Sequence, residues 1–252
     1  MSTTTLTLSP EPRRSWRRWL VKLTTPPAWK LRLVETEFPD EGLGFDRFGL
    51  EHETALLTLG LGHRLAELGF ELHSTGGERL PTRGPFILAA ETMMAPFWVG
   101  AMLITIDVLA QLPKPRLVRT LLAPTWADVP WAGQWLSRAG FVWLTPEHMA
   151  SLARMDQPML LIPGQQRSDD LMSPALIELA LKHDAPFVPV AVRRGPGLTN
   201  TVEIHYGTPL RLGELLRDRP LTPVALRMLT DAVQRHVQEE LQPPGLGMEG
   251  RR

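Results

Sequence analysis

The chain alternates short apolar runs with longer amphipathic segments, and this alternation is the strongest constraint on its fold. Apolar runs bounded by turn residues predict buried strands, and apolar residues at helical spacing predict helices that cover them. We expect an α/β fold, in which helices flank a mostly parallel central sheet. Strands are predicted over residues 86–90, 116–123, 141–144, 159–162, 187–192 and 201–206, and helices over residues 50–69, 96–112, 131–139 and 223–241.

Three hydroxyl–proline pairs mark the starts of further helices. Thr145, Ser173 and Thr222 are each followed directly by a proline. A side-chain oxygen at the N-cap and a proline at the first helical position both favour helix initiation. The helix that follows Thr222 is expected to bury one apolar stripe, formed by Ala225, Met228, Leu229, Ala232, Val233 and Val237.

Composition excludes several functional classes. The 252 residues include 27 basic and 27 acidic side chains, so the chain lacks the basic excess of a typical nucleic-acid-binding protein. There is no cysteine, which excludes disulfides, thiol nucleophiles and thiolate metal sites. The longest apolar run, residues 97–106, is far shorter than the roughly 20 residues of a spanning helix. No secretory signal pattern is present, so a cytoplasmic location is expected.

The zero net charge hides a strongly dipolar N-terminal region. Residues 1–33 carry seven basic side chains and one acid, whereas residues 34–53 carry seven acids and one arginine. At helical spacing, Trp16, Trp19, Leu20 and Leu23 share one face, and most of the positive charge falls elsewhere. Such a helix suits the interface of an anionic membrane, with Arg13, Arg14, Trp16, Arg17, Arg18 and Trp19 as the membrane-facing residues. The alternative is a helix docked on its own domain, with the arginines paired to the acidic stretch.

Familiar catalytic motifs are absent from the sequence. It contains no Gly-x-Ser-x-Gly elbow, no phosphate-binding loop that ends in Gly-Lys-Ser/Thr and no Gly-x-Gly-x-x-Gly fingerprint. The seven histidines show no metal-site spacing, so no metal is expected. His73 and Glu78 lie five residues apart in a turn-rich stretch before the first predicted strand, and we interpret their proximity as coincidental.

Two loops at the carboxyl ends of predicted strands are candidate sites, because ligands of open α/β sheets gather at that edge. One loop runs from Glu91 to Phe97, and the other from Pro163 to Ser168. In the second, an arginine fork and a glycine that permits close backbone approach suit a phosphate or a carboxylate. Its candidate substrate-binding residues are Gly164, Gln165, Gln166, Arg167 and Ser168. An ordinary exposed loop is the alternative.

The order of these segments resembles the lysophospholipid and glycerol-3-phosphate acyltransferase family, including its bacterial 1-acyl-glycerol-3-phosphate members. The resemblance is carried by residues 77–81 with 84–88, 140–144, 159–168, 179–192 and 206–210. Of these, residues 179–192 are the most specific, because an Ala-rich helix end leads there into Pro-x-Val-Pro-Val. The resemblance implies an acyltransferase-like domain over residues 45–241, an N-terminal extension over residues 1–44 and a tail over residues 242–252 that is predicted to be disordered.

The sequence departs from that family at the positions that carry the chemistry. The family pattern places Asn-His-x4-Asp after the first strand, with the histidine as general base and the aspartate orienting it. Here the corresponding positions are Glu91, Thr92 and Phe97, and no carboxylate follows them until Asp107. Thr145 stands where the family carries an arginine, and Gly164 stands where it carries a glutamate. A threonine hydroxyl does not titrate near neutral pH, and losing a positioned base typically costs about 10²–10⁴ in rate.

Two functional hypotheses follow from this pattern. The first is a non-catalytic protein on the acyltransferase fold, which binds phospholipid or acyl chains at a membrane surface as a peripheral protein. The expected acyl groove consists of Met93, Met94, Phe97, Trp98 and Met102, although such residues also suit a plain core. The second is an active acyltransferase with an unconventional base or acceptor. It would need an acyl-thioester donor, and otherwise no cofactor is expected. A subunit that stabilises a protein partner without binding lipid is a third possibility.

Overall fold

The computed structural model describes Arg32, Thr36 and residues 44–69, 71–92, 97–123, 132–162, 173–195, 200–217 and 220–241. The remaining residues of the N-terminal extension, including the six predicted membrane-facing ones, lie outside the described residues, as does the tail over residues 242–252. None of the described helices is both long and apolar enough to cross a membrane.

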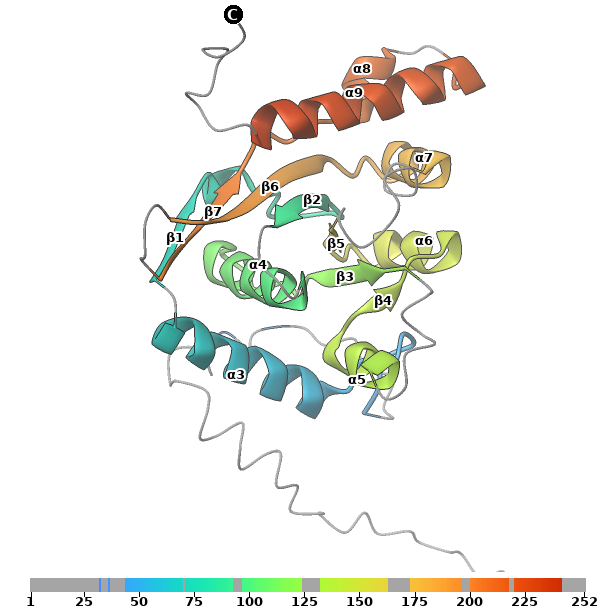
Figure 1. The fold of residues 1–252 in the computed structure, drawn as a ribbon. Helices are drawn as coiled ribbons and strands as arrows, with labels where there is room; N and C mark the ends of the chain where they lie inside the picture. The colour runs from blue at the N-terminus through green and yellow to red at the C-terminus, as the bar shows by residue number, and fades with distance from the viewer. Residues whose placement is uncertain are drawn as a thin grey trace, which may run out of the picture.

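A seven-stranded sheet forms the centre of the fold, in the order β1-β7-β6-β2-β5-β3-β4 (Figure 1). Five strands are parallel to one another, and β7 runs antiparallel to β6 and parallel to β1. The predicted α/β class with a mostly parallel sheet is therefore confirmed. The strands are β1 (Glu71–Thr75), β2 (Ile87–Thr92), β3 (Arg119–Leu122), β4 (Val142–Trp143), β5 (Met159–Leu161), β6 (Phe187–Arg194) and β7 (Thr201–Tyr206).

Helices cover both faces of the sheet (Figure 1). Strand residues alternate between the two faces, so that Leu88 and Ala90 pack on one side and Ile87 and Ala89 on the other. The first face is covered by α4 (Phe97–Gln111) and α5 (Ala132–Ala139), with α3 (His52–Gly69) packed outside α4. The second face is covered by α6 (Pro146–Arg154), α7 (Pro174–Lys182), α8 (Leu212–Leu216) and α9 (Pro223–Leu241).

Helix α4 is buried on two sides, which explains why its sequence is apolar almost throughout. Leu103 and Ile104 face the sheet, whereas Ile106 and Leu109 face α3. An outward stripe of α4 therefore forms a second, smaller core beneath α3. The longest apolar run of the chain thus belongs to a helix held between two layers.

The predicted helix starts at the hydroxyl–proline pairs are confirmed. The Thr145 hydroxyl accepts a hydrogen bond from the His148 amide, and the Ser173 hydroxyl accepts one from the Leu176 amide. The Thr222 hydroxyl accepts one from the Ala225 amide at 3.1 Å. Each bond satisfies a backbone donor that has no partner within its own helix.

The structure corrects three details of the sequence prediction. The stretch that contains His73 forms the strand β1 and does not precede the sheet. The short helix α8 and the 3-10 helix η1 (Gly77–Arg79) had no counterpart in the prediction. On α9, Met228 was expected in the buried stripe but is 60% exposed. The buried stripe runs through Leu229, Val233 and Val237, and Met228 lies outside it.

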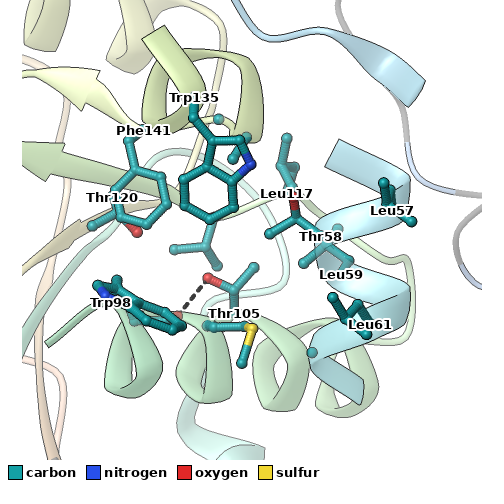
Figure 2. A pocket seen from close by; sticks show the side chains of 16 residues that line it. Leu57, Thr58, Leu59, Leu61, Trp98, Thr105, Leu117, Thr120, Trp135 and Phe141 are labelled. Carbon is teal, nitrogen blue, oxygen red and sulfur yellow. Dashed lines mark hydrogen bonds between the residues drawn. The ribbon is translucent and has the colours of Figure 1, made fainter. Parts of the chain in front are cut away.

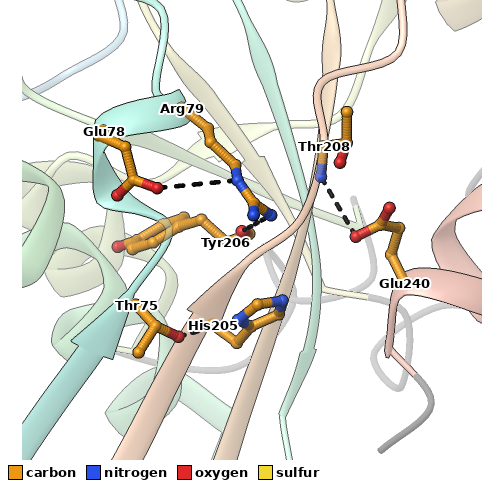
Figure 3. A network of polar contacts seen from close by, with 7 residues as sticks. All are labelled: Thr75, Glu78, Arg79, His205, Tyr206, Thr208 and Glu240. Atoms are coloured by element: carbon orange, nitrogen blue, oxygen red, sulfur yellow. Dashed lines mark hydrogen bonds and ion pairs between the residues drawn. The ribbon is translucent and has the colours of Figure 1, made fainter. Parts of the chain in front are cut away.

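Polar contacts hold the antiparallel end of the sheet to its surroundings (Figure 3). Arg79 on η1 donates a hydrogen bond to the Tyr206 carbonyl at 3.2 Å, and Glu240 on α9 accepts one from the Thr208 amide at 3.3 Å. Gly76 precedes η1 with a φ of +78°, and a Cβ there would lie 2.2 Å from the Tyr206 carbonyl oxygen. Only glycine therefore permits this approach of η1 to β7.

Arg32, the described residue of the basic block, docks on α4, and Thr36 in the acidic stretch bonds to Arg32. The Arg32 guanidinium donates hydrogen bonds to the carbonyls of Leu109 and Ala110, both at 2.9 Å, and to that of Leu112. Thr36 is buried one helical turn later, and its hydroxyl donates to the Arg32 carbonyl. Arg32 thus satisfies carbonyls at the end of α4, where a positive charge also favours the helix dipole.

Candidate functional site

An apolar cavity of about 250 Å³ lies between α3, α4, α5 and β3 (Figure 2). Helix α4 lines it with Trp98, Ala101, Met102 and Thr105, whose spacing places them on one helical face. The opposite walls come from the middle of α3 and from Trp135 and Ala139 of α5. The remaining lining residues are Leu117, Val118, Thr120, Gly140 and Phe141. Segments far apart in the sequence therefore share one cavity.

Two of the three threonine hydroxyls in the cavity wall are satisfied by their own helices, and the third, that of Thr120, belongs to β3. Thr105 on α4 donates to the Ala101 carbonyl at 2.8 Å, a bond visible in Figure 2, and Thr58 on α3 donates to the Thr54 carbonyl at 2.7 Å. None of the described residues that line the cavity has an ionisable side chain. The cavity consequently presents a predominantly apolar surface to a ligand.

Three large apolar side chains of the cavity wall reach the protein surface. Trp98 is 39% exposed, Trp135 is 44% exposed and Leu61 is 46% exposed, and each comes from a different helix. We call these three residues the mouth of the cavity. Exposed tryptophans beside an apolar cavity are typical of surfaces that contact an apolar partner.

Close packing between α3 and α4 shapes the cavity floor. A Cβ at Gly62 would lie 2.2 Å from the Met102 sulfur, so a larger residue would displace the methionine side chain. Glycine at this position lets Met102 lie against α3. Because a methionine side chain is flexible, its position adjusts to the occupant of the cavity more readily than a branched side chain would.

The expected acyl-groove residues divide among several environments. Trp98 and Met102 line the cavity, whereas Phe97 is partly buried and packs against the core between α4 and the sheet. Met93 and Met94 lie outside the described residues. Trp135, Leu61 and Gly62 were not among the candidates, because their apolar or small character marks only a helix interface when α3 and α5 are considered separately.

The two candidate loops leave the sheet side by side. Strand β2 pairs in parallel with β5, with Ala89 opposite Leu161, so the chain leaves both strands at the same edge. Glu91 is exposed near the end of β2, where it lies opposite Ala191 of β6, and Thr92 is the last residue of β2. Gly164, Gln165, Gln166, Arg167 and Ser168 of the other loop lie outside the described residues.

In the sequence, the first carboxylate after Glu91, Thr92 and Phe97 is that of Asp107, and it lies far from this edge of the sheet. Asp107 lies ten residues beyond Phe97, which is about 15 Å along α4. It is buried, and the Tyr206 hydroxyl donates a hydrogen bond to it at 2.7 Å. Burial raises the pKa of the Asp107 carboxyl, and the hydrogen bond from Tyr206 opposes that shift. Asp107 therefore serves the packing of α4 on β7.

Asp107→Asn should flatten the pH dependence of stability. An acid whose pKa is raised by folding stabilises the native state most below its ordinary value of 3.8, and this contribution is lost as the pH rises through the raised pKa. Asparagine retains an oxygen that accepts from Tyr206 but does not ionise. In urea unfolding from pH 4 to 7, the free energy of unfolding of the variant should therefore increase relative to that of the wild type as the pH rises. Parallel profiles of the two proteins would contradict this role of Asp107.

Other polar candidates have local partners. Thr145, which stands at the arginine position of the resembled family, is committed to capping α6. His73 contacts the Glu71 carboxylate at 3.2 Å, and Glu78 contacts Arg79 at 3.8 Å, so the sequence neighbours His73 and Glu78 each have a different partner. Within the described residues, no group of three or more histidines and carboxylates is arranged to hold a metal ion.

Comparisons with known proteins add a structural similarity. No protein-family model and no curated protein matches the sequence. Among solved structures, the chain is similar to the 1-acyl-sn-glycerophosphate (LPA) acyltransferase PlsC from Thermotoga maritima, with a TM-score of 0.45 and 14% identity. The similarity covers 89% of this chain and 92% of the acyltransferase chain. At this TM-score it is too low to indicate a shared function.

Proposed function

We propose that this protein binds one acyl chain, free or as part of a phospholipid, in the cavity between α3, α4 and α5, and that it does not transfer the chain. The observation that carries this proposal is the cavity itself. Its wall is predominantly apolar, the hydroxyls of Thr58 and Thr105 are satisfied within their own helices, and exposed apolar side chains surround its mouth.

The size of the cavity supports a single chain as the ligand. At about 250 Å³ it exceeds the roughly 150 Å³ of an apolar cavity that stays dry and binds benzene. It falls below the roughly 300–1,000 Å³ of pockets that enclose a drug-sized molecule. An acyl segment therefore fits inside, and the head group of a lipid would stay outside.

The sheet edge beside the mouth supports binding without transfer. Trp98 is the second residue of α4, so the mouth lies where the chain has just left β2. Glu91 alternates with Ala90 and therefore belongs to the face of the sheet opposite the cavity. The loops at residues 93–96 and 163–172 contain no histidine. In this proposal Arg167 receives an anionic head group, and no side chain of these loops acts as an imidazole base.

Binding to an alkyl series tests the ligand assignment. Each buried methylene contributes about 0.8 kcal/mol, so affinity should rise about fourfold per added methylene. Isothermal titration of carboxylates of increasing length should show this slope until the chain fills the cavity, and a plateau beyond it. Affinity that is independent of chain length would contradict the proposal.

The active-enzyme hypothesis is tested with acyl-thioester donors and glycerol-phosphate or lysophospholipid acceptors. Bound lipid without turnover is the expected result. Turnover that is abolished by Thr92→Ala or by Glu91→Gln would overturn the non-catalytic assignment, because it would place chemistry at the end of β2.

We further propose that the basic segment around Trp16 and Trp19 brings the protein to anionic membranes as a peripheral protein. Its arginines would contact lipid phosphates, and this attraction is weakened by salt. In vesicle flotation, replacement of Arg13, Arg14, Arg17 and Arg18 by glutamine should reduce binding to anionic vesicles. Equal binding by the wild type and this variant would contradict the proposal.

A further inference from the structure

We infer that the Thr120 hydroxyl selects acyl chains that carry a hydroxyl group at one position along the buried part of the chain. The inference rests on the proposed function and deepens it, because it names the class of acyl chain that the cavity prefers. Its structural basis is a buried hydroxyl in the cavity wall that has no hydrogen-bond partner among the described residues.

Thr120 belongs to the part of the cavity wall that the sheet supplies. It lies on β3 and is only 4% exposed. Residues of β3 alternate between the two faces of the sheet, so that Leu122 packs on the side of α4 and Leu121 packs on the other side. Thr120 shares the face of Leu122, and Figure 2 shows its side chain beside the Phe141 ring in the cavity wall. Its hydroxyl is therefore placed to meet a ligand in the cavity.

The Thr120 hydroxyl differs from the other two threonine hydroxyls of the cavity wall. Thr58 and Thr105 each donate to a carbonyl one turn earlier in their own helix, at 2.7 Å and 2.8 Å. A strand offers no such carbonyl, because its carbonyls lie in the plane of the sheet and its side chains stand roughly perpendicular to it. Within the part of the chain that the structure describes, no group donates to or accepts from the Thr120 hydroxyl.

An unpaired hydroxyl in an apolar wall favours a ligand that supplies a hydrogen-bond partner. Leaving a buried hydroxyl without a hydrogen bond is unfavourable, and a hydroxyl group on the ligand can either donate to Thr120 or accept from it. A water molecule is a poorer partner, because a buried water needs about two to four polar contacts and the hydroxyls of Thr58 and Thr105 already donate elsewhere. A hydroxyl on an acyl chain is held in place by the chain itself, so one hydrogen bond to Thr120 is sufficient.

Thr120 should select the position of the chain hydroxyl and should leave the binding of unsubstituted chains unaffected. An unsubstituted chain leaves the Thr120 hydroxyl unpaired, as it is without ligand, so the dependence of affinity on chain length should remain. A chain hydroxyl at any other buried position loses its hydrogen bonds to water and gains none from the apolar wall. The preferred position is therefore the carbon that comes to lie beside Thr120.

Isothermal titration of dodecanoate and its isomers with one hydroxyl at successive carbons tests this selection. One isomer should bind at least about tenfold more tightly than the isomers with the hydroxyl at other buried carbons. Thr120→Val, which keeps the shape of the side chain, should abolish this maximum and bind dodecanoate within about twofold of the wild type. Thr120→Ser keeps the hydroxyl and should retain the maximum. The matched control Thr105→Val should also retain it, because the Thr105 hydroxyl is bonded within its own helix.

The outcomes of the titration separate the inference from the proposed function. Binding of dodecanoate with equal affinities for all isomers, or a maximum that survives Thr120→Val, would overturn the inference and leave the acyl-chain site standing. Absence of binding by every chain would overturn the proposed function and the inference with it.

Urea unfolding of the ligand-free protein tests the unpaired state of the hydroxyl independently. Thr120→Val should unfold at the same urea concentration as the wild type or at a higher one, because valine removes a buried hydroxyl that has no partner. A lower midpoint for Thr120→Val than for the wild type would show that the hydroxyl already has a hydrogen bond in the free protein, and would overturn the inference.

Discussion

Asp46→Ala should destabilise the protein by about 3–5 kcal/mol, because it leaves a buried charge without its partner. Arg119 is completely buried, and its Nη2 lies 2.7 Å from Oδ2 of Asp46. Within the described residues, the Nε and Nη1 of Arg119 have no hydrogen-bond partner. The other Asp46 oxygen accepts from the amides of Phe48 and Leu50, so the substitution also weakens the turn that leads into α3.

A double replacement separates the stability contribution of the Asp46–Arg119 ion pair from that of the turn. Asp46→Asn with Arg119→Met removes both charges and keeps an oxygen for the two amides, so it should lose less stability than Asp46→Asn alone. Urea denaturation of the single and double variants gives the comparison. Additive losses would show that the ion pair contributes no coupling and would contradict this account.

Thr58→Phe should lower the affinity for an alkyl chain that fills the cavity by about 50-fold, since displacing about three methylenes forfeits about 0.8 kcal/mol each. Thr58 lines the cavity from α3 and is bonded only to the Thr54 carbonyl of its own helix. The phenyl ring can therefore enter the cavity without breaking a contact between helices. Isothermal titration with a chain of saturating length measures the loss.

The control for this variant is Thr58→Val. Valine keeps the shape of threonine and leaves the cavity empty, and the Thr54 carbonyl remains within the helical hydrogen-bond ladder. Its affinity should stay within about twofold of the wild type. If Thr58→Val lost as much affinity as Thr58→Phe, the threonine hydroxyl would bind the ligand, and the cavity would not act through its apolar volume.

The elements that the sequence predicts correctly are those with strong local signals. The caps at Thr145, Ser173 and Thr222 depend on neighbouring residues, and the buried strands β2, β5 and β6 are continuous apolar runs. The strand β1 was missed because it lies at the sheet edge and contains one large apolar residue, Leu72. Its conformation is set by pairing with β7, which local sequence does not reveal.

The cavity was only partly predictable for a similar reason. Trp98 and Met102 come shortly after the candidate loop that runs from Glu91 to Phe97, and this position in the sequence made them candidates. Leu61 and Trp135 lie on two other helices, and their apolar character is equally consistent with ordinary packing. Only the arrangement of α3, α4 and α5 shows that these side chains surround a space and that their outer edges remain exposed.

A crystal structure with a bromine-labelled fatty acid tests the central claim most directly. The anomalous signal of a bromine at the chain terminus locates the bound acyl chain without assumptions about its conformation. The account predicts a bromine peak between α3, α4 and α5, beside Met102 and Thr105, with the carboxylate outside the mouth at Trp98 and Trp135. A peak elsewhere on the protein, with the cavity free of ligand density, would contradict it.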